Sequence, residues 1–310
     1  MRILFAGTPA IAVPSLHAIH RKYDVVGVLT NPDRKKGRGK ALAMSPVKEA
    51  ALELDIPVLQ FPELKGDARR AVAELKPDLL VTFAFGRIFG PRFLALFPLG
   101  GINIHPSLLP KYRGCAPIPA AILAGDKETG ITIQEIALEM DSGDIILQKV
   151  YPIHEDDTTE DLTLRFSREG AHLVVDALEH IEGKTVEKEP QDHSRATYCS
   201  SISKEDGQIS WDASCETIAR MVRAYQPWPR AYTFYREKKL MICEAAAYPE
   251  EHFPQESPGT VIREVPGRGL FLAAGSGSLL VRRLQLEAKR EMDWRAFLNG
   301  NPEVIGSRLG

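Results

Sequence analysis

The stretch Arg2-Ile3-Leu4-Phe5-Ala6-Gly7 decides the fold class, because it opens an apolar strand and is followed by a helical pattern over residues 13–20 and a second apolar strand over residues 25–29. A strand, a helix and a strand in this order place the two strands parallel in one sheet. The same alternation continues with strand patterns over residues 79–83 and 102–104, and with helical patterns over residues 47–54, 68–75 and 119–124. The sequence therefore predicts an α/β fold with a mostly parallel sheet and helices on both faces.

The middle of the chain marks the end of this first domain. Residues 132–136 and 145–150 have the pattern of two more strands, and an apolar stripe from Leu162 to Ile181 recurs at helical spacing. Residues 183–204 are polar and rich in turn formers, without a periodic apolar face. We therefore expect a long helix to close the first domain and a linker to follow it.

The last third of the chain has a different pattern. After a helical stretch over residues 215–224, short strands separated by Gly, Pro and charged residues are predicted over residues 231–235, 240–245, 260–262, 269–272 and 278–286. Strands at this spacing are typical of a small barrel or sandwich. We expect a first domain over residues 1–190, a linker over 191–204 and a second domain over 205–310.

Composition limits the classes of partner. The chain has 310 residues, enough for two domains that each bury a core, and a formal net charge of -2, so only a local patch could attract nucleic acid. Its four cysteines lack the spacing of a zinc site or a disulfide framework. The first residues lack the charged region and apolar stretch that a signal peptide would have, and no stretch approaches the roughly 18 apolar residues of a membrane span. We expect a soluble, cytoplasmic protein without a metal, a membrane partner or a DNA partner.

An amide, an imidazole and a carboxylate stand at the ends of apolar segments: Asn103, His105 and Asp141. If residues 101–105 form a strand, Asn103 and His105 point to one face. An amide beside an imidazole can stabilise the negative oxygen of a tetrahedral intermediate, and a nearby carboxylate can orient the imidazole and favour its charged form. The alternative is a pair satisfied by loop backbone, but the long proline-rich connection after His105 favours function. The set indicates acyl-type transfer.

A concentrated cationic segment lies within residues 31–48. It has six basic residues against one acid, Asp33, and the six are Arg34, Lys35, Lys36, Arg38, Lys40 and Lys48. The segment follows a predicted strand, at the edge where open α/β sheets bind ligands. A charge run is often only a solvated loop, and a clamp for a phosphate backbone is the functional alternative.

Several motifs, in their order and spacing, give the chain a family resemblance. They are residues 2–9, Asn31-Pro32-Asp33-Arg34, Gly37-Arg38-Gly39-Lys40, Ser45-Pro46-Val47-Lys48, the segment from Asn103 to Pro110, Arg113-Gly114-Cys115-Ala116-Pro117-Ile118, Gly125-Asp126, Glu128-Thr129-Gly130 and Pro227-Trp228-Pro229. The chain resembles the 10-formyltetrahydrofolate-dependent formyltransferases, most narrowly those acting on methionyl-tRNA. The resemblance implies a Rossmann-like catalytic domain, an OB-like tRNA-binding barrel, and formyl transfer to the α-amino group of methionine on initiator tRNA.

The resemblance also implies roles for residues. Asn103, His105 and Asp141 would be the catalytic trio. The formyl-folate would be bound by Phe83, Ala84, Phe85, Gly86, Ile88, Ser107, Leu108, Leu109 and Pro110, and the tRNA by Arg34, Lys35, Lys36, Arg38 and Lys40. By the spacing alone, loop hydrogen bonding is the expected role of Ser107 rather than that of a nucleophile. The family usually has Tyr at position 85 and Gln at position 119, where this chain has Phe85 and Pro119.

Two rival functions remain open from the sequence. A formyltransferase for a small amine, such as glycinamide ribonucleotide or an amino sugar, would keep the trio without needing the cationic segment. A tRNA-binding or folate-binding module would lack catalysis. In the second domain, a basic face is also possible, but scattered surface charge explains its residues equally well: Arg263, Arg268, Arg282, Arg283, Lys289 and Arg290.

Overall fold

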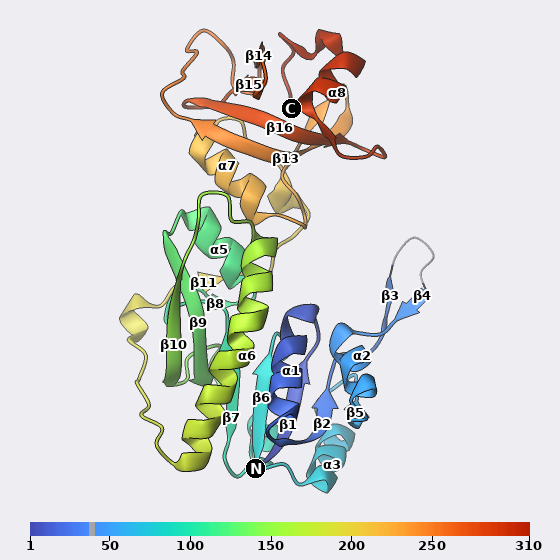
Figure 1. Cartoon of the computed structure of the whole chain (residues 1–310), viewed down its shortest axis with the longest axis vertical. Coiled ribbons are helices and arrows are strands. Elements are labelled where there is room, and N and C mark those ends of the chain that lie inside the picture. Colours follow the sequence, from blue (N-terminus) through green and yellow to red (C-terminus); the bar gives the residue numbers. More distant parts are fainter. Residues whose placement is uncertain (37–40) are drawn as a thin grey trace. The chain divides into compact units, whose positions relative to one another are not determined.

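The computed structural model describes residues 1–36 and 41–310, so the predicted tRNA-binding residues Arg38 and Lys40 lie outside the described part (Figure 1). The chain divides into two compact units. Unit 1 contains residues 1–117, 128–152 and 162–200, and unit 2 contains residues 118–127, 153–161 and 201–310. No helix in the described part of the chain combines the length and apolarity needed to cross a membrane.

Unit 1 is built on a seven-stranded sheet with the order β10-β9-β7-β6-β1-β2-β5. The five strands from β7 to β5 pair in parallel, and β9 and β10 add an antiparallel edge. The strands are β1 (Arg2–Gly7), β2 (Asp24–Leu29), β5 (Val58–Leu59), β6 (Leu79–Phe83), β7 (Gly101–His105), β9 (Glu128–Glu135) and β10 (Ile145–Pro152). The predicted mostly parallel sheet is thus confirmed.

Helices follow the strands of this sheet, and all of them except the short α4 were predicted from the apolar periodicity. They are α1 (Val13–His20), α2 (Pro46–Glu53), α3 (Gly66–Leu75), α4 (Pro91–Leu94), α5 (Pro117–Ala124) and the long α6 (Thr159–Gly183). Their ends follow local chemistry: the Ser45 side chain accepts a hydrogen bond from the Lys48 amide, and Pro46 occupies the first turn of α2. All five residues of β6 are buried, as a central parallel strand requires.

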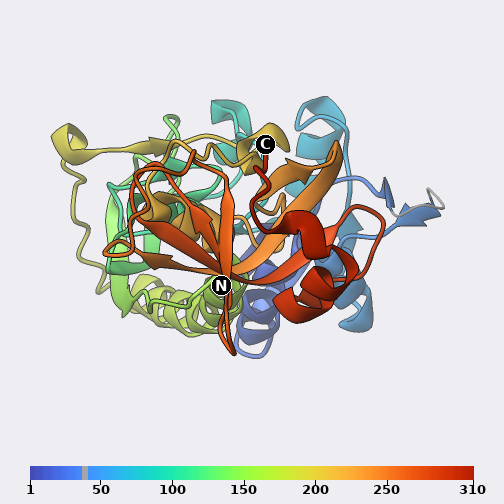
Figure 2. The ribbon, with the colours of Figure 1, turned by 90° about the horizontal axis from the view of Figure 1, so that it is seen from above.

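The cationic segment contains two short strands where we expected only loop. Strands β3 (Arg34–Lys36) and β4 (Ala41–Ala43) pair antiparallel and extend beyond the sheet of unit 1 (Figures 1 and 2). The sequence does not signal this hairpin, because Arg34-Lys35-Lys36 lacks the apolar alternation that marks a half-buried strand. The hairpin is instead defined by backbone pairing alone.

The segment after α6 is ordered against unit 1. Strand β11 (Tyr198–Cys199) pairs in parallel with β8 (Arg113–Gly114), and the short 3-10 helix η2 (His193–Arg195) precedes it. The Arg113 amide donates to the Thr197 carbonyl oxygen, and the Cys115 amide donates to that of Cys199. Residues that we expected to form a linker therefore contact the loop that follows β7.

Unit 2 contains an antiparallel sheet with the order β12-β13-β16-β15-β14, and β17 pairs with β16. The strands are β12 (Tyr232–Tyr235), β13 (Lys238–Tyr248), β14 (Val261–Val265), β15 (Gly269–Ala273), β16 (Ser278–Leu286) and β17 (Met292–Asp293), with 3-10 helices η3 (Glu205–Gly207) and η4 (Pro302–Val304) and helices α7 (Cys215–Ala224) and α8 (Trp294–Gly300). The C-terminal residues bridge the two ends of this path. The Val261 amide donates to the Ser307 carbonyl oxygen, and the Gly310 amide donates to that of Phe234.

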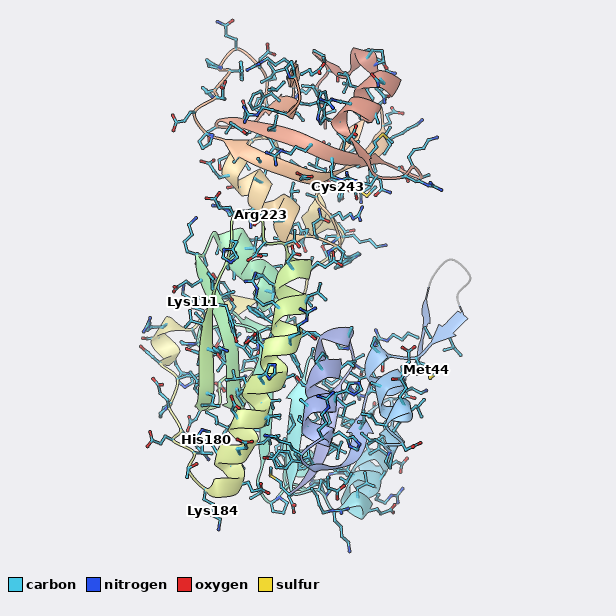
Figure 3. The ribbon with its side chains drawn as sticks, viewed as in Figure 1. Met44, Lys111, His180, Lys184, Arg223 and Cys243 are labelled. Atoms are coloured by element: carbon cyan, nitrogen blue, oxygen red, sulfur yellow. The ribbon has the colours of Figure 1, made fainter. Side chains whose placement is uncertain are left out.

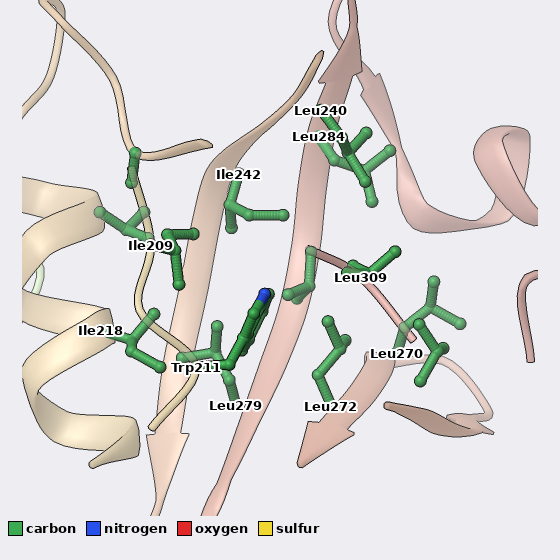
Figure 4. Packing of buried hydrophobic residues seen from close by; sticks show 14 of the residues in the cluster. Ile209, Trp211, Ile218, Leu240, Ile242, Leu270, Leu272, Leu279, Leu284 and Leu309 are labelled. Atoms are coloured by element: carbon green, nitrogen blue, oxygen red, sulfur yellow. The ribbon is translucent and has the colours of Figure 1, made fainter. Parts of the chain in front are cut away.

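The core of unit 2 is one hydrophobic cluster inside this curved sheet (Figure 4). Trp211 and Ile218 pack there with Leu279 and Leu309, and all four are buried. The Trp211 indole donates to Thr233 Oγ1 at 3.0 Å, so its buried N–H is satisfied. Antiparallel strands that close around a core agree with the small barrel predicted from the spacing of the strands.

Candidate active site

Two rows of polar side chains cross the sheet of unit 1 on one face. Thr82 on β6 pairs with Asn103 on β7, which pairs with Gln134 on β9. Two residues further along β7, His105 pairs with Thr132 on β9. Directly opposed residues share a face of a sheet, so these side chains are neighbours. Because four of the five are buried, this face carries polar groups that require hydrogen-bond partners.

The carboxylate of Asp141 lies at the centre of these rows. Its Oδ1 accepts from Gln134 Nε2 at 2.9 Å and from Asn103 Nδ2 at 3.4 Å. Its Oδ2 accepts from the Gly114 amide at 2.8 Å and lies 3.6 Å from His105 Nδ1. The structure therefore brings together all three predicted catalytic residues, although Asp141 is 36 or more positions from the other two in the sequence.

His105 is held at both ring nitrogens. Its Nε2 lies 2.9 Å from the carbonyl oxygen of Tyr112, and its side chain is only 4% exposed. Because a carbonyl oxygen only accepts, Nε2 carries a hydrogen atom, and Nδ1 is the nitrogen that faces the carboxylate of Asp141. A second hydrogen atom on Nδ1 would be donated to that carboxylate, which is the orienting role predicted for Asp141.

The orientation of the Asn103 amide follows from its neighbours. Its Oδ1 accepts from Thr82 Oγ1 at 2.6 Å, which leaves Nδ2 as the donating end toward Asp141. A primary amide carries two N–H groups, and only one of them is directed at Asp141. Asn103 is only partly buried, so its second N–H group is in a position to serve a ligand.

The predicted folate segments differ in how much of each side chain is accessible. Phe83, Phe85, Ser107 and Leu109 are buried, Leu108 and Pro110 are partly buried, and Ala84, Gly86 and Ile88 are exposed, the last by 76%. The Ser107 hydroxyl donates to the Lys111 carbonyl oxygen at 2.7 Å, in agreement with a loop role (Lys111 is labelled in Figure 3). The exposed members are therefore the ones that a ligand could reach directly.

Phe85 stands where the resemblance implied a tyrosine, and its ring belongs to the protein core. It stacks on Phe89 with ring centroids 5.3 Å apart, and Phe89 continues the row to Phe93. The backbone of Phe85 faces another element, since its carbonyl oxygen accepts from Asn31 Nδ2 at 2.8 Å. The ring at position 85 thus packs at the start of an aromatic row.

A pocket of about 370 Å³ opens beside this segment. It is lined by Asn31, Pro32, Arg34, Pro62, Gly86 and Arg87. The guanidinium of Arg87 donates to the carbonyl oxygens of Phe61 and Pro62, both at 2.7 Å, which fixes its charge at the pocket wall. The pocket thus connects a predicted folate-binding residue, Gly86, with a predicted tRNA-binding residue, Arg34.

The structure describes only part of the cationic segment. Arg34 is exposed on β3, and the side chains of Lys35 and Lys36 lie outside the described part together with residues 37–40. Lys48 is not available to a phosphate, because its Nζ lies 2.6 Å from Asp33 Oδ2 and 2.9 Å from Gln60 Oε1. The cationic clamp thus remains a prediction, with Lys48 serving the protein instead.

The basic residues of unit 2 have acidic neighbours. Arg282 pairs with Glu244 at 3.4 Å, Arg283 with Glu291 at 2.7 Å, and Arg263 approaches Glu251 to 3.9 Å. These pairs reduce the positive potential that the six residues would create together. Among the described residues, no cluster of three or more His, Cys, Asp or Glu side chains could hold a metal ion.

Two glutamines of the site were missed by the sequence analysis. Gln134 is 1% exposed and donates to Asp141, and Gln191 is 5% exposed and contacts the backbone of the same residue. Gln134 had a signal, because it is a polar residue inside the apolar run Ile131-Thr132-Ile133-Gln134. Gln191 had none, since it stands in a polar stretch where any residue type is common.

The chain matches two family models over most of its length. Residues 1–178 match the formyl transferase family and residues 201–302 match the formyl transferase C-terminal domain. The chain, in which an amide and an imidazole on β7 meet a carboxylate from the turn after β9, therefore belongs to the formyl transferase family. It is 45% identical to the methionyl-tRNA formyltransferase of Treponema denticola, with 98% of each chain covered. It is 40% identical to that of Koribacter versatilis, with 100% of this chain and 99% of the relative covered.

The fold is also shared with a solved structure of low sequence identity. The N-formyltransferase from Helicobacter canadensis, solved in complex with folinic acid and dTDP-3-aminofucose, aligns with a TM-score of 0.67 at 23% identity. The alignment covers 92% of this chain and 99% of that one. At this identity the likeness concerns the fold.

Proposed function

We propose that this protein transfers the formyl group of 10-formyltetrahydrofolate to the α-amino group of methionine carried on initiator tRNA. The observation that carries the proposal is the meeting of Asn103 and His105 on β7 with Asp141 in the turn after β9. The Asp141 carboxylate lies 3.4 Å from Asn103 Nδ2 and 3.6 Å from His105 Nδ1. The choice of methionyl-tRNA over a small amine rests on the relatives that bear this name and match the whole chain.

The reaction requires stabilisation of one negative oxygen. The free amine attacks the formyl carbon, a C–N bond forms, and the carbonyl oxygen takes the negative charge. The Nδ2–H of Asn103 donates to that oxygen, and a preorganised donor of this kind is worth a factor of about 100 to 1,000. The protonated imidazole of His105, whose two N–H groups face Tyr112 and Asp141, stabilises the same oxygen through its positive charge. The bond from the formyl carbon to the folate nitrogen then breaks, and a water molecule relays the proton from the attacking nitrogen to the leaving one.

Asp141 acts through its neighbours in this scheme. Its Oδ2 faces His105 Nδ1 at 3.6 Å and its Oδ1 faces Asn103 Nδ2 at 3.4 Å. The carboxylate therefore fixes the orientation of both groups that stabilise the oxyanion. The donors Gln134 and Gly114 in turn fix the carboxylate from the protein side.

The binding roles follow the predicted segments. Ala84, Gly86 and Ile88 would contact the folate directly, and the buried Phe83, Phe85, Ser107 and Leu109 would shape the loops that hold it. Arg34, Lys35, Lys36, Arg38 and Lys40 would contact tRNA phosphates. The domain limits of 1–190 and 205–310, with the second domain assisting tRNA binding, are part of the proposal, and we place the protein in the cytoplasm.

The test is formyl transfer by the purified protein. It is incubated with 10-formyltetrahydrofolate and radiolabelled methionyl-tRNA, in parallel with glycinamide ribonucleotide and an amino sugar nucleotide as acceptors. We expect formyl-methionyl-tRNA to form with a kcat/KM far above that for either small amine. Equal use of a small amine would refute the choice of acceptor, and no transfer to any acceptor would refute the enzymatic function.

A further inference from the structure

Gln191 lies in the segment after α6, outside the sheet, and contacts the backbone of Asp141 and of Gly143. Its Nε2 lies 2.9 Å from the Asp141 carbonyl oxygen, 2.7 Å from that of Gly143 and 3.2 Å from Gln134 Oε1. Two hydrogen atoms are thus shared among three acceptors, all of which belong to the strand or turn that holds Asp141. The side chain is 5% exposed, so water does not replace these bonds.

The orientation of the Gln191 amide is set by a buried arginine. Arg113 is 1% exposed, and its Nε and Nη2 donate to Gln191 Oε1 at 3.1 and 2.7 Å. Because Oε1 receives these two bonds, the amide nitrogen must face Asp141 and Gly143. His193 and Tyr198 hold the remaining guanidinium nitrogen at 3.3 Å, so the arginine is itself fixed by the segment after α6.

The backbone that Gln191 contacts needs such support. Asp141 has a φ of 51°, in the left-handed region that residues with a side chain rarely adopt. Gly143 approaches β9 so closely that an added Cβ would lie 2.0 Å from the Glu135 carbonyl oxygen. Backbone in such a conformation persists only when its surroundings fix it. The two carbonyl oxygens held by Gln191 belong to these two residues.

We infer that Gln191, oriented by Arg113, is a positioning residue that holds the Asp141 carboxylate against Asn103 and His105. The inference rests on the proposed function, since it assigns Asp141 a role in formyl transfer. The contacts of Gln191 Nε2 are with Asp141, Gly143 and Gln134. It acts by fixing the turn from Asp141 to Gly143, and thereby the 3.4 and 3.6 Å contacts of the carboxylate.

The test variant is Gln191→Glu, which keeps the size of the side chain and its acceptor for Arg113 but replaces the donating nitrogen by oxygen. Gln285→Glu is the matched control, because Gln285 Oε1 also accepts from an arginine, Arg230, at 2.7 Å, and its Nε2 also donates to a backbone carbonyl oxygen, that of Lys289, at 2.7 Å. We expect kcat to fall about 10-fold to 100-fold in Gln191→Glu, since displacement of a catalytic group by about 1 Å has such an effect. The KM for the folate should stay within about twofold.

A double variant separates positioning from a general structural role. If Gln191 acts through the carboxylate, adding Gln191→Glu to Asp141→Asn should lower kcat by less than about twofold. The inference would be overturned if the two substitutions lowered kcat by the product of their separate factors, or if Gln191→Glu alone left kcat unchanged. Should Gln191→Glu not fold, Arg113→Lys takes its place, because it keeps the charge but not the paired N–H donors, and the same dependence on Asp141 is expected.

A second readout does not depend on activity. The Gly114 amide donates to Asp141 Oδ2 at 2.8 Å, so its proton chemical shift in an NMR spectrum reports the position of the carboxylate. We expect this signal to move upfield in Gln191→Glu and in Asp141→Asn, but not in Gln285→Glu. An unmoved Gly114 signal would refute the inference even in an active enzyme. If the Gly114 signal moves in Gln191→Glu but the wild-type protein has no transferase activity, the proposed function is refuted while the positioning of the carboxylate by Gln191 is supported.

Discussion

Asn103→Ala tests whether the Asn103 amide stabilises the oxyanion, and the contacts of Asn103 allow the expected effects on turnover and on stability to be estimated. The substitution removes Nδ2, the hydrogen-bond donor assigned to the negative oxygen, so turnover should fall about 100-fold to 1,000-fold. It also removes Oδ1, which accepts from Thr82 Oγ1 at 2.6 Å. Thr82 is only 4% exposed, so its hydroxyl would lose its partner at a cost of about 1 to 3 kcal/mol in the free energy of unfolding.

The two effects are separable with Thr82→Val. This substitution removes the hydroxyl that Asn103→Ala would leave without a partner, so the double variant Thr82→Val with Asn103→Ala should regain part of the stability. It should not regain turnover, because the missing oxyanion donor is still missing. Thr82→Val alone leaves Nδ2 in place with one orienting bond fewer, and its turnover should fall less than about 10-fold.

The assay is single-turnover formyl transfer with enzyme in excess over methionyl-tRNA, which reports the chemical step rather than product release. Unfolding by urea, followed by circular dichroism, gives the free energies of unfolding. Turnover of Asn103→Ala within a few-fold of wild type would remove Asn103 from the mechanism. Recovery of turnover in the double variant would show that the loss came from the unsatisfied hydroxyl and not from the oxyanion.

Three further predictions concern the trio, the thiols and the cationic segment. His105→Ala and Asp141→Ala should each lower kcat strongly. In the double variant, kcat should fall by less than the product of the two single-variant factors, because the carboxylate acts through the imidazole. A fall equal to that product would show that the two residues act independently. Burial raises the pKa of the Cys243 thiol to about 12, so only about one in 10,000 of these thiols is ionised at pH 8. Iodoacetamide at pH 8 should therefore alkylate the exposed Cys115 first. Mass spectrometry that finds Cys243 labelled first would contradict this prediction. Arg38→Ala should flatten the slope of log affinity for tRNA against log salt by about one, as expected for the loss of one phosphate contact, and an unchanged slope in filter binding would remove Arg38 from the interface.

The sequence by itself determined the architecture of both units, because apolar periodicity records which face of each element is buried. The run Leu79–Phe83 is a strand with those bounds, and Cys215–Ala224 is a helix with those bounds. It also marked Asn103 and His105 as a pair, since residues two apart on a strand share a face. The short hairpin over Arg34–Lys36 and Ala41–Ala43 escaped it, because three-residue strands leave no periodicity to detect.

The groups that surround the Asp141 carboxylate could be identified only from the folded chain. Strand register places Gln134 beside Asn103, and the pairing of β8 with β11 brings Gln191 and Arg113 to the turn at Asp141. These contacts join residues up to 78 positions apart, as between Arg113 and Gln191. A local pattern cannot encode them, because a buried glutamine in a polar stretch looks like any solvated one until the chain folds around it. The three members of the trio could thus be proposed from the sequence, while the network that fixes their geometry is a property of the fold.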